Sequence, residues 1–157
     1  MQYPGYQTGN VILSEGDWFP FRIHKLVQLQ DESWYYVLQD INGLKHFMPA
    51  QNYTGYGFNQ GDEILCKIDK INCTGRIFLE PKHPFYKEGE IYPFDLVTYF
   101  NKGIDTFLLV REIFGNNIEV PLCRNNNIDI KAEKKITCIV KSIKKGKLIL
   151  ENYKDYR

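Results

Sequence analysis

The sequence predicts an all-β protein made of two tandem five-stranded OB-like barrels. Three observations support this fold class: the chain matches itself at an offset of about 73 residues, its apolar residues alternate with a period of two, and no segment carries a helical period with caps. Each repeat of about 70 residues contains five strand-length segments, a number typical of small closed barrels.

The repeat is read from three pairs of segments. "EGDWFPF" (15–21) matches "EGEIYPF" (88–94), and "WYYVLQDING" (34–43) matches "FLLVREIFGN" (107–116), both at an offset of 73. "GRIFLE" (75–80) matches "GKLILE" (146–151) at 71, so small deletions at turns separate the copies. The predicted organisation is an N-terminal extension at 1–13, a first unit at 14–84 and a second, degenerate unit at 85–157.

The strands are expected in the same order in both units. The first strand of each unit contains a proline, the second is rich in bulky apolar residues, and the fourth and fifth form a hairpin around a glycine. The expected strands are 18–28, 33–39, 44–48, 63–71 and 76–80 in the first unit, and 91–100, 105–111, 118–122, a segment around 136–140, and 147–151 in the second. A turn of helix is expected after Pro49 or Pro121.

The fourth strands show the alternation most clearly. Ile64, Cys66 and Ile68 occupy alternate positions, and Ile136, Cys138 and Val140 repeat the pattern. Cys66 and Cys138 are therefore predicted to be small core residues.

Composition narrows the class of protein. The 157 residues are 43% hydrophobic and 15% aromatic, which is enough for a core, and the net charge is only +1. No apolar run reaches membrane-spanning length, and "MQYPGYQTGN" lacks the features of a signal peptide, so a soluble cytoplasmic protein with no membrane partner is expected. The four cysteines form no CxxC pair, which favours reduced thiols and predicts no metal and no cofactor.

The first unit resembles the S-one type of OB-fold RNA-binding domain. The likeness lies in "EGDWFPFRIHKL", in "YYVLQDINGLKHFMP" with its Gly-Leu-x-His, and in "FNQGDEILCKIDKINCTGRIFLEP" with its Gly-Arg-Ile closure. The resemblance implies an RNA face that contains Tyr36, His46 and Arg76. Asn72 stands where the family has an acidic residue.

The second unit matches this face poorly. Tyr36 is aligned with Leu109, His46 with Ile118 or Glu119, and Arg76 with Lys147, so the unit is expected to keep only cations. Residues 14–86 contain seven basic and nine acidic side chains (net −2), whereas 87–157 contain thirteen and ten (net +3). Seven lysines have Glu133 as their one acidic neighbour along the sequence, and the pattern fits either a non-specific phosphate-binding group or a solvated hairpin: Lys131, Lys134, Lys135, Lys141, Lys144, Lys145 and Lys147.

The function expected from these observations is non-catalytic binding of single-stranded RNA, with DNA as the second choice. No nucleophile, phosphate-binding loop or metal-spaced cluster supports an enzyme. The expected contacts are Trp34, Tyr36, His46, Asn72 and Arg76 in the first unit, and Lys141, Lys144, Lys145 and Lys147 in the second. Trp34 and Tyr36 share one face of their strand and Tyr35 has the other, and which of these faces points outward stays open.

A protein-interaction module is the alternative. Small barrels are reused as docking surfaces, and the segment "PAQNYTGYGFNQ" (49–60) is expected to expose Tyr53, Tyr56 and Phe58 to a protein partner. Salt dependence separates the two functions, because phosphate contacts weaken steeply with ionic strength.

Overall fold

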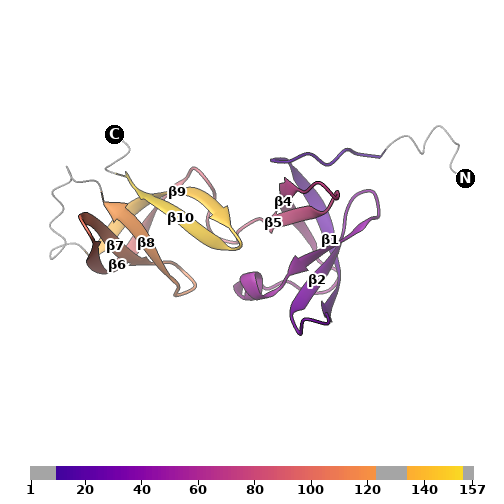
Figure 1. Cartoon of the computed structure of the whole chain (residues 1–157), viewed down its shortest axis with the longest axis horizontal. Helices are drawn as coiled ribbons and strands as arrows, with labels where there is room; N and C mark the ends of the chain where they lie inside the picture. Colours follow the sequence, from indigo (N-terminus) through magenta and orange to yellow (C-terminus); the bar gives the residue numbers. More distant parts are fainter. Residues whose placement is uncertain (1–9, 123–133, 154–157) are drawn as a thin grey trace, which may run out of the picture. The chain divides into compact units, whose positions relative to one another are not determined.

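The chain folds into two all-β units, as the sequence predicts. The computed structural model describes residues 10–122 and 134–153, and its contacts divide the chain between Lys82 and His83. Each unit contains one five-stranded antiparallel sheet and a core of its own (Figure 1). No helix within these ranges is long and apolar enough to cross a membrane.

Unit 1 is a sheet with the strand order β3-β2-β1-β4-β5. A short 3-10 helix, η2, follows β3, at the position where the sequence predicts a turn of helix after Pro49. The elements are β1 (Trp18–Gln28), β2 (Trp34–Gln39), β3 (Lys45–Pro49), η2 (Gln51–Tyr56), β4 (Glu63–Ile71) and β5 (Ile77–Pro81).

Unit 2 repeats this topology with the order β10-β9-β6-β7-β8. Its two edge strands, β8 and β10, contact each other over more of their length than β3 and β5 do in unit 1, so this barrel is nearly closed. The elements are β6 (Ile91–Lys102), β7 (Asp105–Arg111), β8 (Asn117–Leu122), β9 (Lys135–Lys144) and β10 (Lys147–Asn152). The second helical turn expected after Pro121 falls outside the described residues.

The same backbone contacts hold both units. Gly16 N donates to Ile68 O at 2.8 Å in unit 1, and Gly89 N donates to Val140 O at 2.7 Å in unit 2. Next to these bonds, Glu15 Oε1 accepts from Ile71 N at 2.7 Å, and Glu88 Oε1 accepts from Ile143 N at 2.9 Å. Hydrogen bonds that recur at offsets of 72 and 73 support the duplication read from the sequence.

Each long first strand accommodates its proline and a bulge in the same way. Pro20 lies in the half of β1 that pairs only with β4, where a missing N–H costs no ladder bond on the β2 side. Register shifts occur between Ile23 and Lys25 in β1 and between Leu96 and Thr98 in β6. These bulges bend the strands so that each can pair with two neighbours.

The strand register corrects one part of the sequence alignment. Leu38 pairs with Ile23, and Val110 pairs with Leu96, so the offset has already fallen to 72 in the second strands. The counterpart of Tyr36 is therefore the buried Leu108, not Leu109. His46 corresponds to Ile118, because Leu38 pairs with His46 and Val110 pairs with Ile118. The lost residue lies in the hairpin that precedes the second strand.

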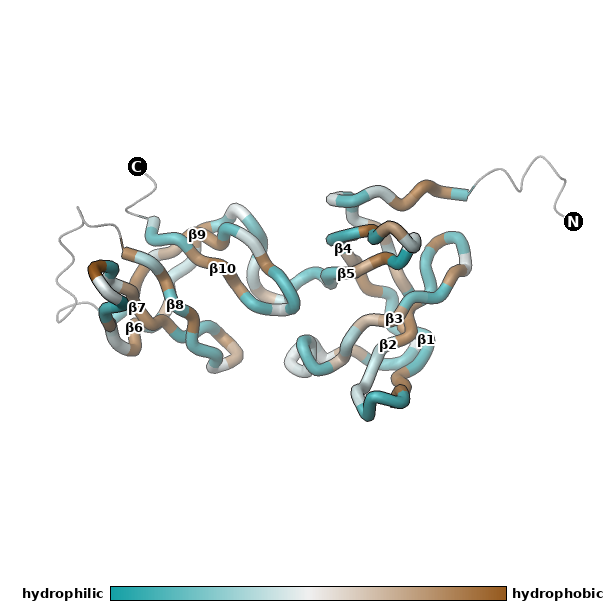
Figure 2. Tube along the Cα trace, in the orientation of Figure 1, coloured by the Kyte–Doolittle hydropathy of each residue, from teal (hydrophilic) through white to brown (hydrophobic). Residues whose placement is uncertain are grey.

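The two cores contain the residues that the alternation predicts. Hydropathy follows the strands, with apolar residues along them and hydrophilic residues in most turns (Figure 2). Cys66 and Cys138 are fully buried, as predicted. Burial raises the pKa of both thiols, that of Cys138 to about 12. Cys73 is exposed, and Cys123 falls outside the described residues.

The expectation that residues 49–60 expose three rings is wrong. The Tyr53 side chain is 2% exposed and donates its hydroxyl to Glu80 Oε1 at 3.3 Å. Tyr56 and Phe58 are partly buried against the unit 1 core, and their ring centroids lie 5.4 Å apart. Apolar rings gain more from covering the core than from solvent, so this segment is part of the fold.

Candidate functional site

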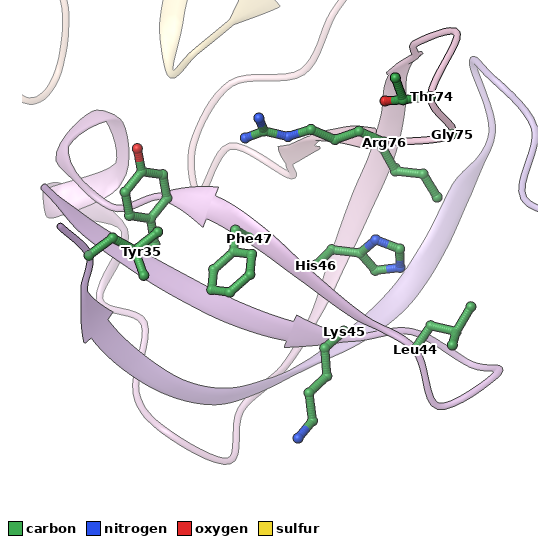
Figure 3. A pocket seen from close by; sticks show the side chains of 10 residues that line it. Tyr35, Leu44, Lys45, His46, Phe47, Thr74, Gly75 and Arg76 are labelled. Atoms are coloured by element: carbon green, nitrogen blue, oxygen red, sulfur yellow. The ribbon is translucent and has the colours of Figure 1, made fainter. Parts of the chain in front are cut away.

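Unit 1 has a hollow between β3 and the β4–β5 hairpin, which we call the β3–β5 hollow. Figure 3 shows the side chains that line it, and its volume is about 660 Å³. It is lined by Leu29, Tyr35, Leu44, Lys45, His46, Phe47, Thr74, Gly75, Arg76 and Ile77. This lining contains the six-membered rings of Tyr35 and Phe47, the His46 imidazole and two permanent cations, and it contains no carboxylate.

The two rings come from adjacent strands. Tyr35 on β2 and Phe47 on β3 share the outer face of the sheet, with ring centroids 6.3 Å apart and an interplanar angle of 89°. The Tyr35 hydroxyl donates to Asp31 Oδ2 at 3.0 Å, a bond that fixes the ring and raises the pKa of the phenol. Phe47 is 45% exposed, so its face is open to a flat ligand.

His46 lines the hollow and is held by a buried carboxylate. Its Nε2 lies 2.8 Å from Asp40 Oδ2. The other oxygen of Asp40 accepts from the backbone N–H groups of Asn42 and Leu44, which fixes the β2–β3 turn. The imidazole is thus positioned by the turn that precedes β3.

Asn72 shapes the hairpin that presents Arg76. Asn72 Oδ1 accepts from Thr74 N at 3.1 Å, from Thr74 Oγ1 at 2.7 Å and from Arg76 N at 2.8 Å. The Arg76 guanidinium carbon lies 5.0 Å from the centroid of the Phe78 ring, and the side chain extends above β3 in Figure 3. The structure gives Asn72 a place in the turn, not in the lining.

Trp34 and Tyr36 lie on the other face of β2. They line a second hollow of about 630 Å³, which we call the Trp34 hollow, together with Leu26, Glu32, Ser33, Ala50, Gln51 and Thr54. Tyr36 also packs against the core and Phe58, and this burial raises its pKa. The structure therefore brings His46 and Arg76 together with Tyr35 and Phe47, and it separates Trp34 and Tyr36 from them.

The predicted group of lysines is divided along β9. Lys141, Lys144, Lys145 and Lys147 are exposed on β9 and around the β9–β10 turn. Lys134 and Lys135 lie at the opposite end of β9, with Lys135 about 20 Å from Lys141 and about 30 Å from Lys144 at 3.3 Å per residue. Lys135 Nζ lies 2.9 Å from Asp95 Oδ1, so the strand pairing gives this lysine an acidic neighbour that is distant in the sequence. Lys131 and Glu133 fall outside the described residues.

The outer face of unit 2 also carries aromatic rings, which corrects the expectation that it keeps only cations. Phe107 occupies the position of Tyr35, and its ring stacks on Phe100 at 5.6 Å with an interplanar angle of 14°. Lys102 Nζ lies 5.5 and 5.4 Å from the centroids of Phe100 and Phe107, and 3.0 Å from Glu119 Oε2. Glu119 replaces Phe47 here, so an ion pair covers the rings that unit 1 leaves open.

No protein-family model matches the chain, and no curated protein matches it significantly.

The outward position of Phe47 could have been predicted from the sequence, but the family resemblance pointed to Tyr36 and His46 instead. In "KHFMP", period-two alternation puts His46 and Met48 on one face and Phe47 on the other. Met48 is buried, which turns Phe47 outward.

Proposed function

We propose that this protein is a non-catalytic, cytoplasmic binder of single-stranded RNA, and that the β3–β5 hollow holds the strand. The observation that carries the proposal is the lining itself: Tyr35 and Phe47 offer ring faces, Lys45 and Arg76 offer positive charge, and no carboxylate interrupts the surface. Single strands are bound by this combination of stacking platforms and a cationic track.

Hydrogen bonds hold several residues of the hollow in place, as a rigid binding face requires. Asp31 fixes Tyr35, Asp40 fixes His46, and Asn72 fixes the turn before Arg76. Side chains that are ordered before binding lose little conformational entropy when the ligand arrives. Neither Asp31 nor Asp40 lines the hollow, and Asp40 is buried.

Fluorescence polarisation of labelled uridine and deoxythymidine decamers tests the proposal, measured at about 50 and 200 mM salt. With two phosphate contacts, from Lys45 and Arg76, the increase in salt over that range should weaken binding to a single strand roughly sevenfold. Additional contacts from Lys141, Lys144, Lys145 and Lys147 would steepen the dependence.

Point variants locate the face. Phe47→Ala should weaken binding by roughly five- to 150-fold, because one stacked base contributes about 1 to 3 kcal/mol. Arg76→Ala should weaken binding and reduce the salt dependence. Tyr99→Ala and Arg111→Ala are matched controls, because they remove an exposed ring and an exposed cation from unit 2. Affinities that stay unchanged in both Phe47→Ala and Arg76→Ala would contradict the proposed face.

A further inference from the structure

Glu32 occupies a backbone position that this fold otherwise gives to glycine. Four turns in the described residues share one five-residue hydrogen-bonding pattern. The N–H of the first residue donates to the carbonyl of the fifth, and the carbonyl of the first accepts from the N–H of the fourth. The fourth residue of the turn is Gly43, Gly75 or Gly115 in three of them, each with φ between 83° and 88°. In the β1–β2 turn it is Glu32, with φ 64°. A side chain at positive φ costs stability, and such outliers gather at functional positions.

Glu32 is the one charged residue that lines the Trp34 hollow. The remaining lining residues are neutral, including the polar side chains of Ser33, Gln51 and Thr54, and no cation lines the hollow. Trp34 is 50% exposed, so much of its indole is open to a ligand. This hollow has the opposite charge to the β3–β5 hollow and disfavours a phosphate.

We infer that the Trp34 hollow binds an arginine side chain of a partner protein. A guanidinium stacks on an indole face and also pairs with a carboxylate, and Leu26 and the Tyr36 ring can contact the methylene stem. Charge complementarity selects this occupant over a nucleic-acid strand. The site is separate from the β3–β5 hollow, so this inference does not depend on the proposed RNA binding.

Nuclear magnetic resonance of the full chain tests the inference with two peptides. The probe is acetyl-Gly-Arg-Gly-amide, and its neutral isostere is acetyl-Gly-citrulline-Gly-amide. The arginine peptide should shift the Trp34 indole N–H signal at millimolar concentration, and the citrulline peptide should shift it much less. Trp18 is the internal control, because it is also exposed but does not line the hollow.

Two substitutions at Glu32 separate the carboxylate from the backbone. Glu32→Gln keeps a side chain at positive φ and should weaken binding of the arginine peptide roughly two- to fivefold, the range for an exposed ion pair. Glu32→Gly should weaken it at least as much and raise the Tm by about 4 °C, because glycine relieves the strained φ. Glu63→Gln, an exposed carboxylate on β4, should change neither measurement.

Four results would overturn the inference. They are equal shifts from the arginine and citrulline peptides, equal shifts of Trp18 and Trp34, unchanged arginine affinity in Glu32→Gln, and a Trp34 shift produced by a uridine decamer but not by the arginine peptide. The last result would assign Trp34 to a nucleic-acid strand.

Discussion

The His83 imidazole accepts two backbone hydrogen bonds at a single nitrogen. The N–H groups of Phe85 and Tyr86 both donate to Nδ1 at 3.1 Å, and the ring lies against Tyr86 and Phe114. His83 is 4% exposed, and burial lowers its pKa from 6.5 to about 4. A protonated Nδ1 could accept neither bond, so the entry to unit 2 requires the neutral ring.

His83 should make unit 2 less stable in weak acid. Between pH 6.5 and 4 the unfolded chain binds a proton at this residue that the folded chain does not, so stability falls as the pH decreases through this window. We expect a loss of about 2 kcal/mol between pH 7 and 5, measured by urea unfolding.

The control for this prediction is His83→Asn, which cannot titrate but keeps an oxygen that can accept from the same N–H groups. The variant should lose less stability than the wild type over the same pH interval, because the remaining titratable groups are common to both. Parallel pH profiles would show that another group causes the loss.

At the scale of elements, η2 both covers the unit 1 core and makes a buried polar contact with the sheet. Tyr53 is the buried residue of this helix, and its hydroxyl reaches Glu80 on β5. Desolvation by burial, and then the charge of Glu80, raise the pKa of Tyr53. The helix is therefore held to the sheet by a hydrogen bond as well as by apolar contacts.

Two substitutions at Tyr53 separate these contributions. Tyr53→Phe keeps the ring and removes one buried donor, which should cost about 1 to 2 kcal/mol of unfolding free energy. Tyr53→Ala should cost about 3 to 5 kcal/mol, as aromatic deletions from cores do. Chemical denaturation measures both, with Tyr99→Phe as the exposed control. A Tyr53→Ala variant as stable as the wild type would show that η2 does not cover the core.

The matched glycines before β1 and β6 give a second prediction about elements. Gly16 and Gly89 both have φ 86° and make equivalent bonds to β4 and β9. Gly16→Ala and Gly89→Ala should each destabilise their unit by about 1 kcal/mol, because L residues are strained at this φ. Thermal melts of the two variants should show similar losses, and a loss in only one would mean that the two anchors differ in importance.

The order of elements could be predicted from the sequence, but the faces of β2 could not. Period-two alternation identifies a strand and its two sets of residues, yet bulky residues occupy both faces here, with Trp34 and Tyr36 on one and Tyr35 on the other. The face that points outward depends on how β2 pairs with its neighbours, where Leu38 lies opposite Ile23 and His46, and these contacts are distant in sequence. The internal alignment that paired Tyr36 with Leu109 was one residue out for a related reason, because the shift to Leu108 shows only in the strand pairing.

At the scale of the whole molecule, the two units have separate cores. The cluster around Phe21 and Leu38 contains only residues of unit 1, and the cluster around Phe94 and Leu108 only residues of unit 2. A unit that buries its own apolar residues has what independent folding requires.

Each unit should therefore fold alone. Fragments 1–82 and 83–157, cut at the observed boundary, should each show a strand-type circular dichroism spectrum and a cooperative unfolding transition. Protection of Cys66 and Cys138 from a thiol reagent in the respective fragment would report native burial. Rapid labelling of either cysteine would show that its unit needs the rest of the chain.

The closing hairpins make the two barrels a donor and an acceptor for loop grafting. Unit 1 has five residues (72–76) between the pair Ile71 and Ile77, and unit 2 has four (144–147) between Ile143 and Leu148. The strands on either side occupy equivalent positions in both sheets, so an engineer could transplant the Asn72 turn, with Arg76 at its end, onto β9 and β10. Such a chimera would carry an arginine-bearing loop in place of the lysines at 144, 145 and 147, while the strands that close the barrel stay unchanged.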